Sequence, residues 1–240
     1  HIQHSGYLPP DLEAAVGWCE TAFGAINAGG GPMQQSYAVP SGGRNAYVRF
    51  GHVEAEIIEP GEKKGLSTGR LTMHHVGYVV ADIEQSTAAL TAKGFKFAGD
   101  SARTNVMGQQ LRYFDSSTVN GVLVHLTQLP APSGSGPVGS GVEIERIVHA
   151  GYRVKDLDKA IAWYVDNYQG EHFGGGASRT GGRNAFVNFG DVQVELIQPP
   201  DTSAMADDAH EMDHVGYVVG DIPSCMGCLL YTSPSPRDRG

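Results

Sequence analysis

Apolar and polar positions follow two different periods along the chain, and the period changes from one short segment to the next. In residues 157–168 the apolar side chains recur at i, i+3, i+4, i+7 and i+11, which places them on one face of a helix. These side chains are Leu157, Ala160, Ile161, Tyr164 and Tyr168. Residues 45–50 and 53–58 instead alternate with a period of two, and the glycine turn between them predicts two strands of a hairpin.

An aspartate stands at the start of each predicted helix, directly after a short apolar segment that carries His-x-Gly-Tyr. These aspartates are Asp11, Asp82 and Asp156. A carboxylate at this position accepts hydrogen bonds from the free N–H groups of the first helical turn. Each unit therefore reads as a strand, a capped helix and three further strands, a β-α-β-β-β module of an α+β protein.

The modules recur along the chain. GGRNAYVRFG at residues 42–51 recurs as GGRNAFVNFG at 181–190, and HHVGYVVADI at 74–83 recurs as DHVGYVVGDI at 213–222. The first module therefore matches the third and the second matches the fourth, which indicates a duplicated pair. The modules run over residues 1–62, 72–129 and 145–201, and a fourth opens at residue 212 and is cut short.

The repeat predicts two domains. Residues 1–129 form the first, with two modules, and residues 145–227 form the second, which is truncated in its second module. Residues 130–144 between them are rich in Pro, Gly and Ser, a composition typical of a linker. Residues 228–240 resemble the translation of a sequencing adapter, so we expect them to be non-native and exclude them from the fold.

Composition narrows the range of partners. The chain has 240 residues and a net charge of −9 without a basic run, which argues against nucleic acid and anionic membranes as partners. No apolar stretch approaches the roughly 20 residues of a membrane span. Three cysteines do not suggest a disulfide framework, so a reduced, cytoplasmic location is expected. A small-molecule substrate is the expected partner, and self-association as a homo-oligomer stays open.

These motifs resemble the vicinal oxygen chelate superfamily, which includes glyoxalase I, methylmalonyl-CoA epimerase, extradiol dioxygenases and bleomycin-binding proteins. The H-x-G-Y-V-V-x-D-I segment and the E-x-x-x-P strand end are most similar to the epimerase-like branch. The resemblance covers nearly all of residues 1–222. It implies that two modules pair so that their sheets curve around one shared metal cleft.

The resemblance also implies the metal ligands, because the family motifs place one on the first strand and one on the last strand of each module. Residue by residue, the four positions are His4, Glu56, His75 and His125. This donor set suits one divalent ion, Zn²⁺, Mn²⁺, Co²⁺, Ni²⁺ or Fe²⁺. His125 departs from the usual pattern, because a glutamate is common at its position.

The second half repeats part of this set. His149, Glu195 and His214 match the first three positions in order, so we expect a second, partial metal site that binds weakly or not at all. Arg44 and Arg183 of the repeated Gly-Gly-Arg-Asn are candidates to bind a substrate carboxylate or phosphate. A surface role in closing a turn is the favoured interpretation for both arginines.

The resemblance and the predicted ligands lead to a metal-dependent enzyme of the glyoxalase or epimerase type. The ion would chelate two adjacent oxygens of a substrate, with a CoA ester as first choice, and stabilise the enolate formed by proton removal. Glu54, which alternation places on the same face as Glu56, and Glu56 itself are the candidate bases. The alternatives are an Fe²⁺ extradiol-type dioxygenase and a non-catalytic, ligand-sequestering protein of the bleomycin-resistance kind.

Overall fold

A computed structural model describes residues 1–28, 37–39, 42–64, 66, 71–130, 144–178 and 181–226. The expected adapter-like tail lies outside these residues, and so does nearly all of the expected linker. Among the residues that are described, no helix is both long and apolar enough to cross a membrane.

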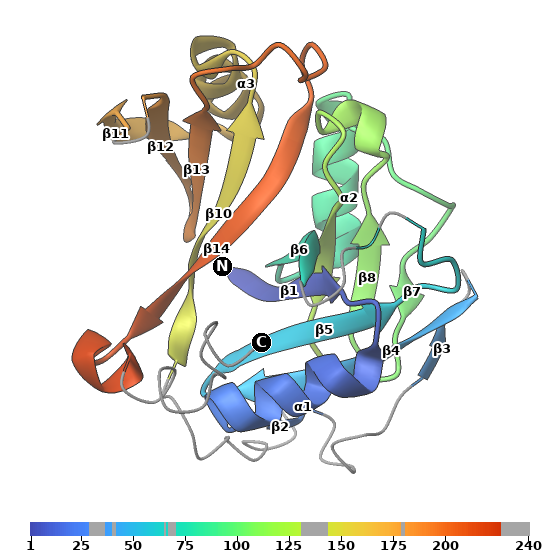
Figure 1. Cartoon of the computed structure of the whole chain (residues 1–240). Coiled ribbons are helices and arrows are strands. Elements are labelled where there is room, and N and C mark those ends of the chain that lie inside the picture. The colour runs from blue at the N-terminus through green and yellow to red at the C-terminus, as the bar shows by residue number, and fades with distance from the viewer. Residues whose placement is uncertain are drawn as a thin grey trace. The chain divides into compact units, whose positions relative to one another are not determined.

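The α+β class with repeated β-α-β-β-β modules is confirmed (Figure 1). The first module consists of β1 (Ile2–Leu8), α1 (Leu12–Phe23), β2 (Ile26–Asn27), β3 (Tyr37–Val39), β4 (Gly43–Phe50) and β5 (Val53–Glu59). The second consists of β6 (Thr72–Val79), α2 (Ile83–Ala92), β7 (Arg103–Thr104), β8 (Gln110–Tyr113), the 3-10 turn η1 (Ser116–Thr118) and β9 (Val124–Gln128). The third consists of β10 (Ile144–Val154), α3 (Leu157–Tyr168), β11 (Glu171–Ala177), β12 (Arg183–Phe189) and β13 (Val192–Gln198). The fourth contributes β14 (His210–Val219) and a helical turn at 222–226.

The predicted helix starts are confirmed. Asp11, Asp82 and Asp156 are N-caps with extended backbones, and each side chain accepts a hydrogen bond from the backbone N–H three residues on. Asp221 makes the same contact at the helical turn of the fourth module, where the distance to the Ser224 nitrogen is 2.9 Å. The short polar side chain before an apolar helical stretch therefore sets where each helix begins.

Each complete module pairs its first strand with its last strand in parallel, and all three use the same register. The glycine of His-x-Gly-Tyr lies opposite the predicted ligand on the last strand. These pairs are Gly6 with Glu56, Gly77 with His125, and Gly151 with Glu195. The repeat in the sequence is thus a repeat in backbone hydrogen bonding.

The chain divides into two compact units. The first unit comprises His1–Gln3, His75–Ala131 and Ile147–Gly216, and the second comprises His4–His74, Pro132–Arg146 and Tyr217–Gly240. The first unit therefore combines most of the second and third modules, whereas the second unit combines the first module with the end of the fourth module's strand. The two contiguous domains expected from the repeat stay a prediction.

In the first unit, β10, β13, β12 and β11 lie side by side, and α3 packs against β12 and β13 (Figure 1). A second set of neighbours runs β6, β9, β8 and β7. The aromatic core of this unit includes Tyr152, which is fully buried and whose hydroxyl lies 3.2 Å from that of Tyr78. These two tyrosines of the repeated motif therefore belong to the core of this unit.

In the second unit, β5 lies between β1 and β4, and α1 packs against β4 and β5 (Figure 1). The hydroxyls of Tyr7 and Tyr217 lie 2.8 Å apart, and the Tyr217 ring contacts Phe50 edge-on. Cys19 of α1 is buried here, and burial raises the pKa of its thiol to about 12. The hydroxyl of the repeated Tyr thus joins different modules in both units.

Candidate metal centre

Three side chains of the first unit converge from neighbouring strands. His149 comes from β10, Glu195 from β13 and His214 from β14, and the strands β13 and β14 both pair with β10. Their potential ligand atoms all lie within 4.8 Å of one another. The structure therefore brings together the three residues that the sequence assigned to the second, partial site.

The triangle of donor atoms has the size that a metal ion needs. The two imidazole Nε2 atoms lie 3.0 Å apart, and Oε2 of Glu195 lies 3.5 Å from His149 Nε2 and 3.2 Å from His214 Nε2. Two ligand atoms bound to one ion at about 2.0–2.1 Å are separated by about 2.9–3.4 Å in octahedral or tetrahedral geometry. Two nitrogens and one carboxylate oxygen at these separations fit a divalent transition metal ion.

The protonation of this cluster also favours ligand chemistry. Burial lowers the pKa of His149, and the adjacent His214 lowers it further, while Glu195 opposes the shift. The Nδ1 atom of His214 lies 2.9 Å from a carboxylate oxygen of Asp213. This contact with Asp213 fixes the orientation of the His214 ring, so that its Nε2 atom faces Glu195.

In the second unit, His4 and Glu56 form the corresponding pair. His4 Nε2 lies 3.8 Å from Glu56 Oε2, and both side chains are buried. Glu56 is oriented from β4 by the Asn45 amide and by the Tyr47 hydroxyl, the latter at 3.2 Å. Both contacts hold Oε1 of Glu56, so Oε2 is the oxygen that faces His4.

The supporting amide was not predicted from the sequence. Asn184 of β12 donates a hydrogen bond of 2.8 Å to Glu195, just as Asn45 does to Glu56. Both asparagines are the fourth residue of the repeated Gly-Gly-Arg-Asn. This repeat is the sequence signal from which their shared supporting role could have been predicted. Groups that hydrogen-bond a ligand from behind fix its orientation and tune its basicity.

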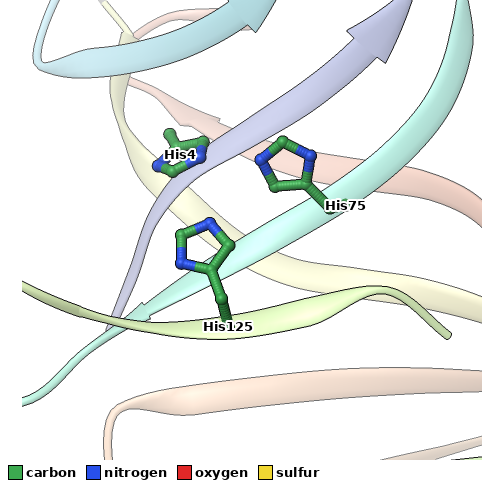
Figure 2. Close-up of side chains that lie close together, drawn as sticks. All are labelled: His4, His75 and His125. Carbon is green, nitrogen blue, oxygen red and sulfur yellow. The ribbon is translucent and has the colours of Figure 1, made fainter. Parts of the chain in front are cut away.

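His75 and His125 lie next to each other in the first unit. They are fully buried on β6 and β9, and their ring centroids are 5.2 Å apart. Figure 2 shows both rings, together with His4 of β1. The Nδ1 atom of His125 lies 3.2 Å from the Leu126 carbonyl oxygen and 3.1 Å from the Thr127 hydroxyl. Contacts of this kind at one ring nitrogen fix the orientation of the imidazole.

Glu54 lies two residues before Glu56 on β5 and is also buried, with 5% of its surface exposed. It faces Arg49 of β4 in register, and the guanidinium lies 3.6 Å from its carboxylate. Alternation puts Glu54 and Glu56 on the same side of the strand. Two carboxylates on one face allow one to bind an ion while the other exchanges a proton.

The two arginines of Gly-Gly-Arg-Asn bind acidic or amide groups of their own modules. Arg44 forms a bidentate pair with Glu13 in the first turn of α1 and donates a 2.7 Å hydrogen bond to Glu59 of β5. Arg183 contacts Asp158 of α3 and Gln198 of β13 at 3.3 and 3.2 Å. Each guanidinium thus connects the start of a helix to the last strand, and a substrate role for either stays a prediction.

Comparison with known families gives one match. A family model described as the Glyoxalase/Bleomycin resistance protein/Dioxygenase superfamily matches residues 3–113 and 148–230, more than half of the chain. Among solved structures, a variant of 4-hydroxymandelate synthase from Streptomyces coelicolor has a TM-score of 0.67 at 13% identity. That match covers 96% of this chain and 74% of the synthase chain, and it establishes a common fold.

Methylmalonyl-CoA epimerases are also among the similar structures. The enzyme from Streptomyces coelicolor, in complex with 2-nitronate-propionyl-CoA, is 21% identical with a TM-score of 0.45, over 54% of this chain and 97% of the epimerase. The enzyme from Mycobacterium tuberculosis is 19% identical with a TM-score of 0.46, over 55% of this chain and 88% of the epimerase. No curated protein matches the chain.

Proposed function

Because the chain belongs to the Glyoxalase/Bleomycin resistance protein/Dioxygenase superfamily, we propose that it is a divalent-metal enzyme that moves a proton at a carbon next to a carbonyl group. The proposed ligands are His4, Glu56, His75 and His125. The substrate class to test first is a CoA thioester with an exchangeable α-proton. This choice rests on the epimerase-like strand motifs of the sequence.

The second half of the chain supports this ligand set. His149, Glu195 and His214 occupy the positions that His4, Glu56 and His75 occupy in the repeat, and within one unit they form a triangle of ion-binding size. The contacts of His4 and Asn45 with Glu56 in the second unit reproduce those of His149 and Asn184 with Glu195. Because equivalent residues lie on equivalent strands of the repeat, we propose that His4, Glu56 and His75 also bind a metal ion.

The observation that carries the proposed reaction is the pair of buried carboxylates on one face of β5. An ion held by the four proposed ligands would supply Lewis acidity to the substrate carbonyl, which makes the neighbouring C–H bond more acidic. The Glu54 carboxylate takes that proton as the C–H bond breaks. Return of a proton to the same carbon completes the reaction, with inversion when it arrives at the opposite face. Glu56 is the second candidate base.

Solvent exchange tests this proposal directly. The full chain, loaded in turn with Zn²⁺, Mn²⁺, Co²⁺, Ni²⁺ or Fe²⁺, is incubated in D₂O with methylmalonyl-CoA, and deuterium at the α-carbon is followed by mass spectrometry. Glu54→Gln should slow exchange at least about 100-fold, the lower range for loss of a general base, and still bind metal. Glu20→Gln, an exposed change on α1, is the matched control and should leave exchange intact.

Other outcomes would redirect the assignment. Oxygen uptake with the Fe²⁺ protein and no solvent exchange favours the dioxygenase alternative. Ligand binding without metal uptake or turnover favours the sequestering alternative. Exchange that persists unchanged in Glu54→Gln and is lost in Glu56→Gln while metal is still bound moves the base from Glu54 to Glu56.

A further inference from the structure

The glycine of His-x-Gly-Tyr is present in all four modules, although its backbone does not require it. Gly151 of β10 and Gly216 of β14 lie within regular strands, and neither is among the residues with positive φ. A side chain at either position would therefore be acceptable to the backbone. The requirement for glycine must therefore come from the side chain that packs against it.

Each of these glycines faces the histidine of the other strand. A Cβ placed on Gly151 would overlap the His214 ring, at 2.5 Å from Nδ1 and 2.9 Å from Nε2. A Cβ placed on Gly216 would overlap the His149 ring, at 2.6 Å from Nδ1 and 2.8 Å from Nε2. The two contacts are reciprocal, so each His-x-Gly segment offers a ring and receives one.

The register connects this contact to the proposed metal site. Gly151 lies opposite Glu195, so a ring that rests over Gly151 lies directly beside that carboxylate. His214 is placed in this way, and its Nε2 is 3.2 Å from Glu195 Oε2 and 3.0 Å from His149 Nε2. Without the empty space above the glycine, the ring would be pushed away from both partners.

We propose that Gly151 and Gly216 are positioning residues that seat the rings of His214 and His149 for metal binding. This inference rests on the proposed function in that it extends its metal chemistry to the second cluster, His149, Glu195 and His214, and it adds two residues that bind neither ion nor substrate. Gly6 and Gly77 hold the same place in the motif and the same register against Glu56 and His125, so the repeat predicts the same role for them.

The contacts predict that alanine at these positions displaces a ring while the fold is retained. The overlapping atoms at Gly151 and Gly216 belong to the outer part of a side chain, which can rotate away. At Gly182 the overlapping atoms belong instead to the backbone of Gln198 and Pro199, which cannot move independently. At Gly176 of β11 a Cβ would meet nothing within 4 Å, so Gly176→Ala is the matched control.

Zinc titration of the full chain tests this role, with the imidazole NMR signals of His149 and His214 as the readout for this site alone. Gly151→Ala and Gly216→Ala should each weaken zinc binding at these signals by about 10-fold or more, the range seen when groups that orient ligands are lost. Gly176→Ala should bind as the parent does. In the zinc-free protein, both variants should also lose the NMR signature of the hydrogen bond between the two rings. Thermal unfolding should stay close to that of the control.

The ligand variant separates the two proposals. If His214→Ala loses zinc affinity and Gly151→Ala and Gly216→Ala do not, the seating role is wrong and the metal site stands. If His214→Ala binds zinc as tightly as the parent at these signals, the cluster of His149, Glu195 and His214 is not a metal site, the seating role for metal binding is wrong, and the proposed site at His4, Glu56, His75 and His125 is untouched.

A double variant covers the case in which alanine destabilises the protein. If the Cβ of Gly151→Ala conflicts only with the His214 ring, then adding His214→Ala should restore the melting temperature. A double variant that stays as unstable as Gly151→Ala would show that the backbone needs the glycine, and would overturn the inference.

Discussion

Burial of His210 should make the first unit less stable in mild acid. The side chain is 7% exposed and lies among aromatic rings, with centroids 5.7 Å from Tyr164 and 5.9 Å from Trp163. Its Nδ1 has no hydrogen-bond partner within the described part of the chain. Burial lowers the pKa of His210 from 6.5 to about 4, and Asp208 only partly opposes this shift.

The size of the effect follows from the two pKa values. Above pH 6.5 the ring is neutral in the folded and the unfolded chain, so it contributes no pH dependence. Between pH 6.5 and about 4 the unfolded chain binds a proton that the folded chain does not, so stability falls as the pH falls. Each unit in this window costs about 1.4 kcal/mol, so the loss between pH 8 and pH 5 is about 2 kcal/mol.

Urea unfolding at pH 8 and pH 5 measures this loss. Trp163 lies beside His210, and a Trp18→Phe background makes Trp163 the sole tryptophan reporter, because the chain has two tryptophans. Replacing His210 by Phe should reduce the pH dependence of the unfolding free energy by about 2 kcal/mol. His172→Gln, an exposed change on β11, should leave it unchanged. If the His210→Phe and parent chains differ by less than about 0.5 kcal/mol in their pH dependence, the reasoning is refuted.

Three further predictions concern single side chains. Removing the N-cap carboxylate with Asp156→Ala should cost about 1 kcal/mol of unfolding free energy in urea, whereas Asp166→Ala on the exposed side of α3 should cost much less. The ligand change His125→Ala should weaken divalent-metal binding by about 10-fold or more in calorimetric titration, and unchanged affinity would remove His125 from the site. Asn184→Ala should weaken binding by a similar factor, about 10-fold, with a change confined to the Glu195 cluster.

Local patterns were enough to predict the modules. The spacing of apolar residues in 157–168 and the aspartates before each helix depend only on neighbours in the chain, and they gave the helix starts that the structure has. The end of α3 also agrees with the pattern, because the helix ends at Tyr168, the last apolar residue of the predicted face, and the chain turns at Gln169, with φ of 56°, directly before Gly170. The predicted ligands on the last strands followed from strand alternation and the family resemblance together.

Contacts between distant strands could not be predicted in the same way. That Asn184 supports Glu195 depends on the pairing of β12 with β13, and the contact of Gly151 with the His214 ring joins residues 63 positions apart. His210 has no sequence signal for its burial, because Asp207 and Asp208 lie shortly before it and Glu211 follows it. Such features arise only when separate parts of the chain meet.

The composition of the compact units has a consequence for synthesis on the ribosome. The first unit draws on three separate stretches of chain, and its core includes the Tyr78–Tyr152 contact between the second and third modules. A growing chain that has reached residue 131 has made only part of this unit, and the unit is complete only at Gly216, 85 residues later (216 − 131), so the apolar surface of the second module stays without its partners until then. At typical elongation rates of about 5–20 residues per second, that exposure lasts several seconds. During this interval Tyr78 of the second module has not yet met Tyr152 of the third.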